Sequence, residues 1–197
     1  MERRLLPLVF VFVVVTASVA QLGVVQQNAP GVRIRSRSVS DFLAAQRILL
    51  SNFCRLDYEG ARLQAAGWNR FKPFTALKKN PEFERVVVVQ RFDIDSPEQP
   101  TETVHVNYKA VGYYDFHEGY AAASASERVG FRVQEQNDTL LVTEIVPSSP
   151  HVSPRAALEW LNARLNDTNT SELERTYLKD AIQQVTKLVP PPHAVAQ

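Results

Sequence analysis

The sequence has 197 residues, of which 45% are hydrophobic and 22% are charged, the composition of one globular domain with a real core. Its formal net charge of +1 makes nucleic acid or an anionic membrane unexpected as the main partner. Cys54 is the only cysteine, which excludes an internal disulfide, and we interpret it as a small buried residue.

The first twenty residues have the layout of a secretory signal peptide. A basic start at Glu2-Arg3-Arg4 precedes an apolar run from Leu5 to Val15, and Ser18-Val19-Ala20 supplies the small residues of a cleavage site. We therefore predict a mature chain that begins at Gln21 and is secreted or periplasmic. The apolar run is shorter than the ~20 residues of a spanning helix, so no integral membrane span is expected after cleavage. An uncleaved N-terminal anchor is the alternative.

Three further segments follow the predicted signal peptide. Residues 21–38 are predicted to be a flexible linker, because they show no sustained period and contain Asn28-Ala29-Pro30-Gly31. Arg33, Arg35 and Arg37 make the end of this linker basic. Residues 39–189 are predicted to form a single α+β domain, and residues 190–197 a disordered tail that begins in a run of prolines.

A first helix is predicted to begin near Ser40, a good N-cap. Its apolar residues recur at helical spacing: Phe42, Ala45, Leu49, Phe53 and Leu56. Asp57 lies on the same face near the helix C-terminus, where the helix dipole disfavours a carboxylate. A structural interpretation gives Asp57 a salt bridge or hydrogen bonds at the turn around Gly60, and a functional one places it in a cavity. Residues 63–71 are predicted to be a short second helix or an irregular turn.

Four strands are predicted next, at residues 85–95, 101–114, 128–135 and 139–146. The small-residue run 119–126 is predicted to be a connection. In the first strand Gln90 shares its face with Val86, Val88, Phe92 and Ile94, and the four consecutive valines indicate that both faces are partly covered. Gly112 suits a bulge or a sharp bend in the second strand.

Alternation along the strands predicts which side chains form the core. One continuous buried face is expected, with His105, Lys109 and Arg132 on the other face. The residues expected on the buried face are Val88, Phe92, Val106, Tyr108, Phe131 and Val133. If the sheet encloses a cavity, the inward polar side chains and one loop histidine are the candidate ligand-binding residues: Asp57, Gln90, Tyr108 and His151.

Two C-terminal helices complete the predicted domain. Ser153 caps the first of them, with Pro154 at its first position, and Ser171 with Glu174 forms a capping box for the second. The fold class is therefore α+β: a curved antiparallel sheet of about four strands, with N-terminal helices packed on its concave face and two C-terminal helices.

The sequence lacks the motifs that name a reaction. It has no glycine-rich phosphate loop, no paired cysteines and no Gly-x-Ser-x-Gly motif. We therefore expect no cofactor and no metal, and assign no catalytic residue. Asn-x-Ser/Thr sequons occur at Asn137, Asn166 and Asn169, all in predicted turns, and they matter only if the chain follows a eukaryotic secretory route.

Residues 53–60 (Phe-Cys-Arg-Leu-Asp-Tyr-Glu-Gly) with Gly67-Trp68, and Pro150-His151-Val152-Ser153 ahead of the helix that contains Ala156-Ala157, resemble exported bacterial proteins of the cone-fold superfamily. This superfamily contains the nuclear transport factors and the ketosteroid isomerases. The resemblance covers residues 40–188 and implies a cone-shaped fold. It carries over no catalytic residue.

Two functions from different classes follow. The first is an exported, non-catalytic module that binds a small apolar ligand or an envelope protein. The alternative is a cofactor-independent isomerase, dehydratase or hydrolase that works in a cavity of the cone. The absence of a catalytic constellation favours the first. A homodimer stays open as a further expectation.

Overall fold

The structure is a computed structural model that describes residues 32–33 and 38–190. The predicted signal peptide at residues 1–20, most of the predicted linker and residues 191–197 of the predicted tail lie outside the described residues.

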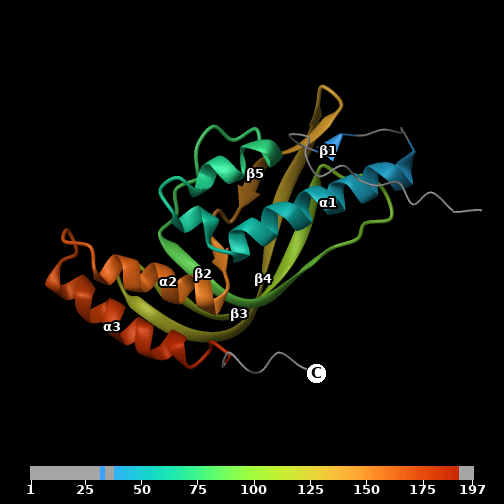
Figure 1. Cartoon of the computed structure of the whole chain (residues 1–197). Coiled ribbons are helices and arrows are strands. Elements are labelled where there is room, and N and C mark those ends of the chain that lie inside the picture. Colours follow the sequence, from blue (N-terminus) through green and yellow to red (C-terminus); the bar gives the residue numbers. More distant parts are fainter. Residues whose placement is uncertain (1–31, 34–37, 191–197) are drawn as a thin grey trace, which may run out of the picture.

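A curled, six-stranded sheet forms the frame of the α+β domain (Figure 1). The strands lie in the order β1-β5-β4-β3-β2-β6 and comprise β1 (Val32–Arg33), β2 (Arg85–Ile94), β3 (Thr103–Asp115), β4 (Gly119–Gln136), β5 (Thr139–Val146) and β6 (His151–Val152). All neighbours pair antiparallel except β2 and β6, which are parallel. The four long strands correspond to the four predicted ones, although β4 is longer than predicted. The two-residue edge strands were not predicted, and β6 makes the sheet mixed rather than antiparallel throughout.

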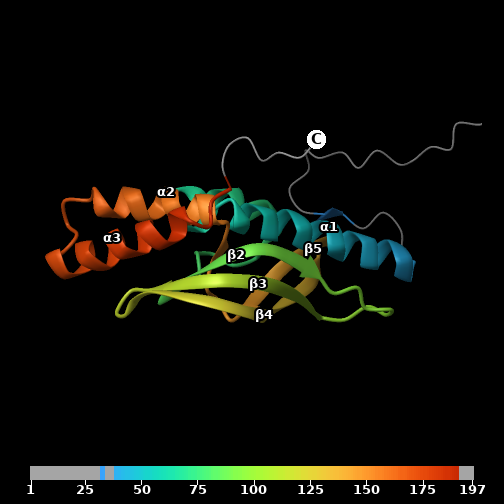
Figure 2. The ribbon, with the colours of Figure 1, turned by 90° about the horizontal axis from the view of Figure 1, so that it is seen from below.

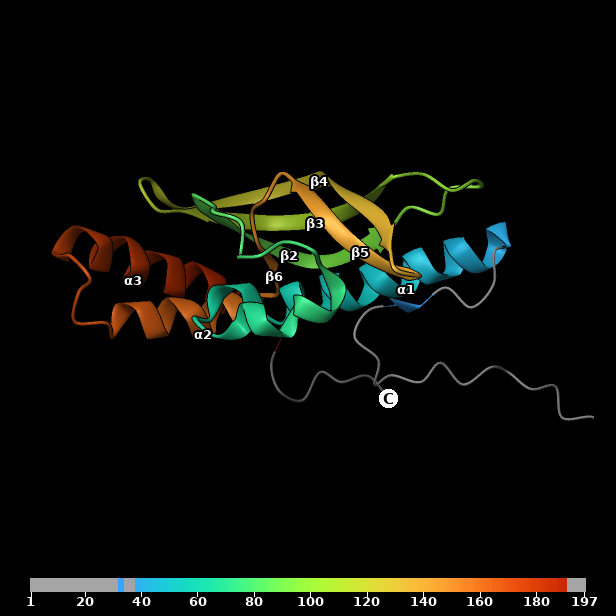
Figure 3. The ribbon, with the colours of Figure 1, turned by 90° about the horizontal axis from the view of Figure 1, so that it is seen from above.

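Three α-helices lie on the same side of the sheet: α1 (Val39–Tyr58), α2 (Pro154–Leu165) and α3 (Glu172–Thr186) (Figures 2 and 3). Ser153 and Ser171 cap α2 and α3 as predicted, but the N-cap of α1 is Ser38 rather than Ser40. Three short 3-10 turns follow α1: Ala61–Leu63, Gly67–Arg70 and Lys72–Phe74. Among the described residues, no helix combines the length and the apolar character needed to cross a membrane.

Strand β4, which was predicted at residues 128–135, begins earlier than predicted, at Gly119. Residues 119–126, expected to be a connection, form the first half of β4 and pair with β3 as far as Asp115↔Gly119. Their small side chains give a weak strand signal alone, and pairing with a long neighbour decides their conformation. Gly112 lies at the expected bulge, and a Cβ there would come within 2.0 Å of the Tyr120 hydroxyl oxygen. The glycine therefore makes room for an aromatic ring.

Two hydrophobic clusters hold the helices to the sheet. In the first, α1 packs on the strands, and the ring of Phe53 lies 4.7 Å from that of Phe71 and 5.7 Å from that of Phe131. In the second, α2 and α3 cover the start of β2 and the end of β3. The four-valine run of β2 serves both, because Val87 and Val89 belong to the first cluster and Val86 and Val88 to the second. The prediction that both faces are covered there is confirmed.

The predicted inner face is confirmed on β3 and β4 but not throughout β2. Val88 is buried in the second cluster rather than the first, and Phe92 is half-buried. Val106, Tyr108, Phe131 and Val133 are buried, while Lys109 and Arg132 are exposed and His105 is half-buried. Register shifts on both sides of Val89 change the phase of β2, so Val89 is buried and the Gln90 side chain is exposed. Strict alternation fails here because a bulge adds a residue to one strand.

Phe131 is the most direct test of the first cluster, because its ring is 2% exposed. We expect Phe131→Ala to lower the free energy of unfolding by about 3–5 kcal/mol, from lost burial and the cavity that remains. Phe116→Ala is the matched control, since that ring is 40% exposed. Urea unfolding of the two variants measures the difference, and a loss below about 1 kcal/mol for Phe131→Ala would contradict its place in the core.

Candidate functional site

Three of the four predicted site residues converge at the end of α1. The backbone N–H of His151 donates to Asp57 Oδ2 at 3.1 Å. The Tyr108 ring stacks on the His151 imidazole with 4.1 Å between centroids and 25° between planes. All three residues are buried and no more than 2% exposed. Gln90 does not join them, and only its carbonyl oxygen takes part in a contact, by accepting from the Tyr58 hydroxyl at 3.1 Å.

Arg62 is the functional neighbour that the sequence analysis missed. Its buried guanidinium lies 3.7 Å from Asp57 Oδ2, which is the salt bridge of the structural interpretation. It also donates to Asn80 Oδ1 at 2.9 Å and to the carbonyl oxygens of Ser149 at 3.4 Å and Ser148 at 2.5 Å. An arginine just across the Gly60 turn from a buried aspartate was the available signal, because buried charges are paired.

Burial dominates the protonation of this cluster. It raises the pKa of Asp57, with the positive charge of Arg62 acting in the opposite direction. It also raises the pKa of the Cys54 thiol to about 12 and that of Tyr108 well above its ordinary value. The Tyr108 hydroxyl donates to Cys54 Sγ at 3.1 Å, and Cys54 is fully buried, as predicted. A thiol held in this form is a poor nucleophile.

Glu127 extends the cluster towards the surface. Its Oε2 lies 3.5 Å from His151 Nε2, which is longer than a well-formed hydrogen bond. Its Oε1 accepts from Arg85 at 3.2 Å. His151 and then Arg85 lower the pKa of Glu127 against the opposing effect of its burial.

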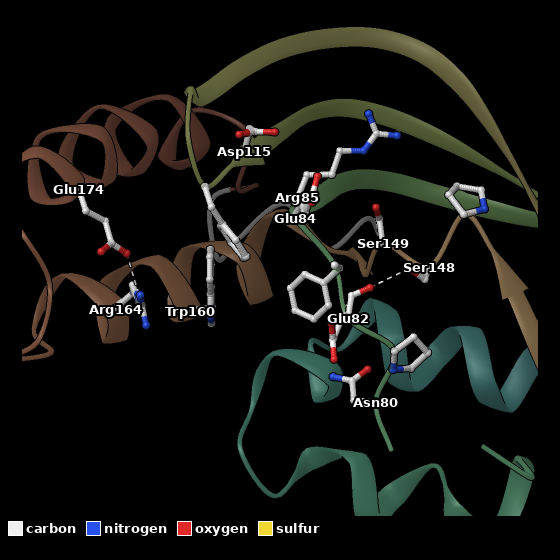
Figure 4. A pocket seen from close by; sticks show the side chains of 14 residues that line it. Asn80, Glu82, Glu84, Arg85, Asp115, Ser148, Ser149, Trp160, Arg164 and Glu174 are labelled. Carbon is white, nitrogen blue, oxygen red and sulfur yellow. Dashed lines mark hydrogen bonds and ion pairs between the residues drawn. The ribbon is translucent and has the colours of Figure 1, made fainter. Parts of the chain in front are cut away.

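An open cleft lies beside the buried cluster (Figure 4). It measures about 1210 Å³ and runs between the segment that leads into β2, the β5–β6 connection and the α2–α3 pair. Asn80, Ser148 and Ser149, which hold Arg62, line it, as does Arg85, which holds Glu127. Asn80, Ser148 and Ser149 form what we call the floor of the cleft. The buried ion pair therefore holds this floor in place, although Asp57 and Arg62 do not line the cleft.

Aromatic rings form one wall of the cleft. Phe116 lies 5.9 Å from Phe83 and 6.1 Å from Trp160, measured between ring centroids, and these three residues line the cleft. Tyr114 supports them from below, with its ring 5.7 Å from Trp160 in an edge-on contact. Despite these contacts Phe116 is 40% exposed, which makes it one of the few exposed large hydrophobic side chains between positions 38 and 190.

Charged side chains of both signs surround this wall. The lining carries the carboxylates of Glu82, Glu84, Asp115 and Glu174 and the guanidinium groups of Arg85 and Arg164. Arg164 is paired with Glu174 at 2.7 Å, at one end of the cleft in Figure 4. Burial raises the pKa of Tyr114 to about 12, and the carboxylate of Glu174 contributes in the same direction. The cleft is therefore acidic on balance.

A second cavity of about 330 Å³ lies between α1 and the β2–β3 connection. Gln46, Ile94 and Val104 contribute to its lining, and Gln46 Nε2 is held by the carbonyl oxygen of Thr101 at 2.7 Å. Neither of these two cavities is lined by Asp57, Tyr108 or His151. The convergent residues predicted from sequence thus lie in a sealed cluster.

No group of three or more His, Cys, Asp or Glu side chains is placed to hold a metal ion within the described residues. Comparisons of the chain with protein-family models, curated proteins and solved structures find no match.

We expect Asp57→Asn to lower the free energy of unfolding by about 3–5 kcal/mol, because it leaves the guanidinium of Arg62 buried without its counter-charge. The control is Glu59→Gln, two residues along the chain, whose exposed ion pairs with Arg55 and Arg70 are worth about 0–1 kcal/mol. Adding Arg62→Met to Asp57→Asn should recover part of the loss, since no unpaired charge then remains. An Asp57→Asn variant as stable as the wild type would contradict a structural role.

The lowered pKa of Glu127 predicts a pH dependence. Because the folded state holds this carboxylate below its ordinary pKa of 4.5, its stabilising contribution is present above that pH and is lost as pH falls through the folded-state pKa. We expect Glu127→Gln to cost about 1 kcal/mol near pH 6 and much less near pH 3. Urea unfolding at both pH values measures this, with the exposed Glu135→Gln on the same strand as control. Equal losses at the two pH values would contradict the assignment.

Proposed function

We propose that this chain is an exported, non-catalytic binding module that holds a segment of an envelope or secreted protein in its cleft. The observation that carries the proposal is the arrangement of the cleft: an aromatic wall on which Phe116 is exposed, charged edges and lining residues held by a buried ion pair. A surface that is already formed before binding lowers the ordering cost of binding.

The size of the cleft favours a chain segment over a small molecule. Its volume of about 1210 Å³ exceeds the roughly 300–1,000 Å³ of ordinary ligand pockets. Its lining also carries six charged side chains, which suits a polar polypeptide better than a small apolar ligand. Aromatic anchors with a polar rim are the usual composition of protein-binding surfaces.

The relation to the cone-fold superfamily remains a proposal of the same kind. Its support is a curled sheet with α1, α2 and α3 all on one side, together with burial of the inner faces of β3 and β4 against α1. On this proposal the N-terminal helix packs on the concave face of the sheet. The function of the module still has to come from its cleft, because one fold serves many functions.

A cofactor-independent enzyme is the alternative function, and one observation favours it. Asp57 Oδ1 and His151 Nε2 are buried and have no hydrogen-bond partner within the described residues. Two such groups have the capacity for proton transfer. Against this, both side chains are sealed from solvent, and substrate access would require the β5–β6 connection to open. If the wild type catalyses a reaction and Asp57→Asn abolishes that activity without changing the free energy of unfolding, the result would favour the enzyme.

Selection from a phage-displayed library of random peptides of about twelve residues tests the binding function, since a segment of that length spans a surface of this kind. We expect enriched peptides to bind the full chain, and Phe116→Ala or Trp160→Ala to weaken that binding by about tenfold through loss of an aromatic anchor. Fluorescence anisotropy of the labelled peptides gives the affinities.

The matched control is Val39→Ala, which truncates an exposed apolar residue at the start of α1, outside the cleft lining. It should leave the affinities unchanged. A library that yields no enriched peptide, or peptides that bind Phe116→Ala as tightly as the wild type, would argue against a binding function of the cleft.

A further inference from the structure

We infer that the segment bound in the cleft is basic, with lysine or arginine side chains that lie between the carboxylates and the aromatic wall. This inference rests on the proposed function, and it names the chemistry of the partner. Three features of the cleft support it: its charge balance, the pairing of its own cations and the position of its aromatic rings.

The charge balance of the cleft is negative. Four carboxylates and two guanidinium groups line it, and both guanidinium groups already have partners. Arg164 is paired with Glu174, and Arg85 with Glu127, which lies outside the lining. An acidic segment would therefore find no free cation in the lining, and it would face the remaining carboxylates.

The remaining carboxylates are available to a partner. Within the described part of the chain, the side chain of Glu84 has neither an ion pair nor a hydrogen bond, and it is exposed. Glu82 is paired only with Lys79, a contact of 2.9 Å between two highly exposed side chains that is easily exchanged. Asp115 accepts from the backbone N–H groups of His117 and Glu118 through Oδ1, and these contacts leave its charge uncompensated.

The aromatic wall supplies the apolar half of the recognition. Lysine and arginine stems pack on rings while their cationic groups reach carboxylates at the rim. The same neighbourhood already uses such contacts internally: the Arg62 guanidinium lies 5.8 Å from the ring centroid of Phe83, and that of Arg85 lies 5.9 Å from the ring centroid of Tyr113. Phe116 and Trp160 are the rings left for a cation from outside.

Three matched peptides test the inference. The first has about ten residues with about four lysines, and the others replace those lysines by glutamine or by glutamate, which changes charge alone. We expect the lysine peptide to bind the full chain about tenfold more tightly than the glutamine peptide in about 50 mM salt, and the difference to shrink in about 500 mM salt through screening. The glutamate peptide should bind most weakly.

Variants of the chain locate the effect. The double substitution Glu82→Lys and Glu84→Lys should weaken the lysine peptide about tenfold. The control pair Glu98→Lys and Glu135→Lys makes the same change in net charge at exposed positions outside the cleft lining, and should have little effect. Equal effects of the two pairs would overturn the inference, because they would show attraction to net charge rather than to the cleft.

The remaining outcomes separate this inference from the proposed function. If lysine and glutamine peptides bind equally and both depend on Phe116, the cleft binds a segment but not a basic one, and only the inference fails. If no peptide binds and the random library also yields none, the proposed function fails as well. If Arg35→Gln with Arg37→Gln strengthens binding of the lysine peptide, the occupant is the basic segment of this chain itself, which overturns an external partner.

Discussion

The buried ion pair of Asp57 and Arg62 joins the end of α1 and the turn that follows it to the β5–β6 connection, which is far away in sequence. Asp57 lies in the last turn of α1, Arg62 lies in the first 3-10 turn, and the guanidinium donates to the carbonyl oxygens of the β5–β6 connection. Removing two charges from water is costly, and their attraction compensates only when the remaining hydrogen-bonding capacity is filled. Here Asn80, Ser148 and Ser149 fill it for the guanidinium. These hydrogen bonds consequently fix the backbone positions of the residues that surround the guanidinium.

The shape of the cleft depends on that constraint. Asn80, Ser148 and Ser149 both bind the Arg62 guanidinium and line the cleft, so charge burial positions part of the cleft lining. The arrangement also explains why a cluster of titratable groups need not be an active site. Asp57, Tyr108 and His151 converge as catalytic groups would. Burial moves the pKa of Tyr108 and that of its neighbour Cys54 away from neutral pH, whereas it raises the pKa of Asp57 towards neutral pH.

The sequence predicted those parts of the fold in which local pattern and burial agree. The strand over residues 139–146 was predicted with the observed bounds, and the Ser153 and Ser171 caps were found because their chemistry is local. Gln90 was misplaced because bulges depend on the partner strand, and the start of β4 was missed because alanines and serines carry little hydrophobic contrast. The cleft was out of reach for a different reason: its lining runs from Asn80 to Glu174, and only tertiary packing brings these residues together.

The division of the apolar interior into two clusters has a consequence for cooperativity. The α2–α3 hairpin is held mainly by the second cluster, so it is a candidate for opening as a unit while α1 and the sheet stay folded. Trp160 and Glu174, which line one wall of the cleft, belong to that hairpin. Arg85 is the first residue of β2, and Glu84 directly precedes it, so both lie on the sheet side of the cleft. A segment bound across the cleft links the two units and must be released before they separate. An occupant of the cleft would thereby make the domain a single cooperative unit, and slow hydrogen exchange would spread from the sheet into the C-terminal hairpin.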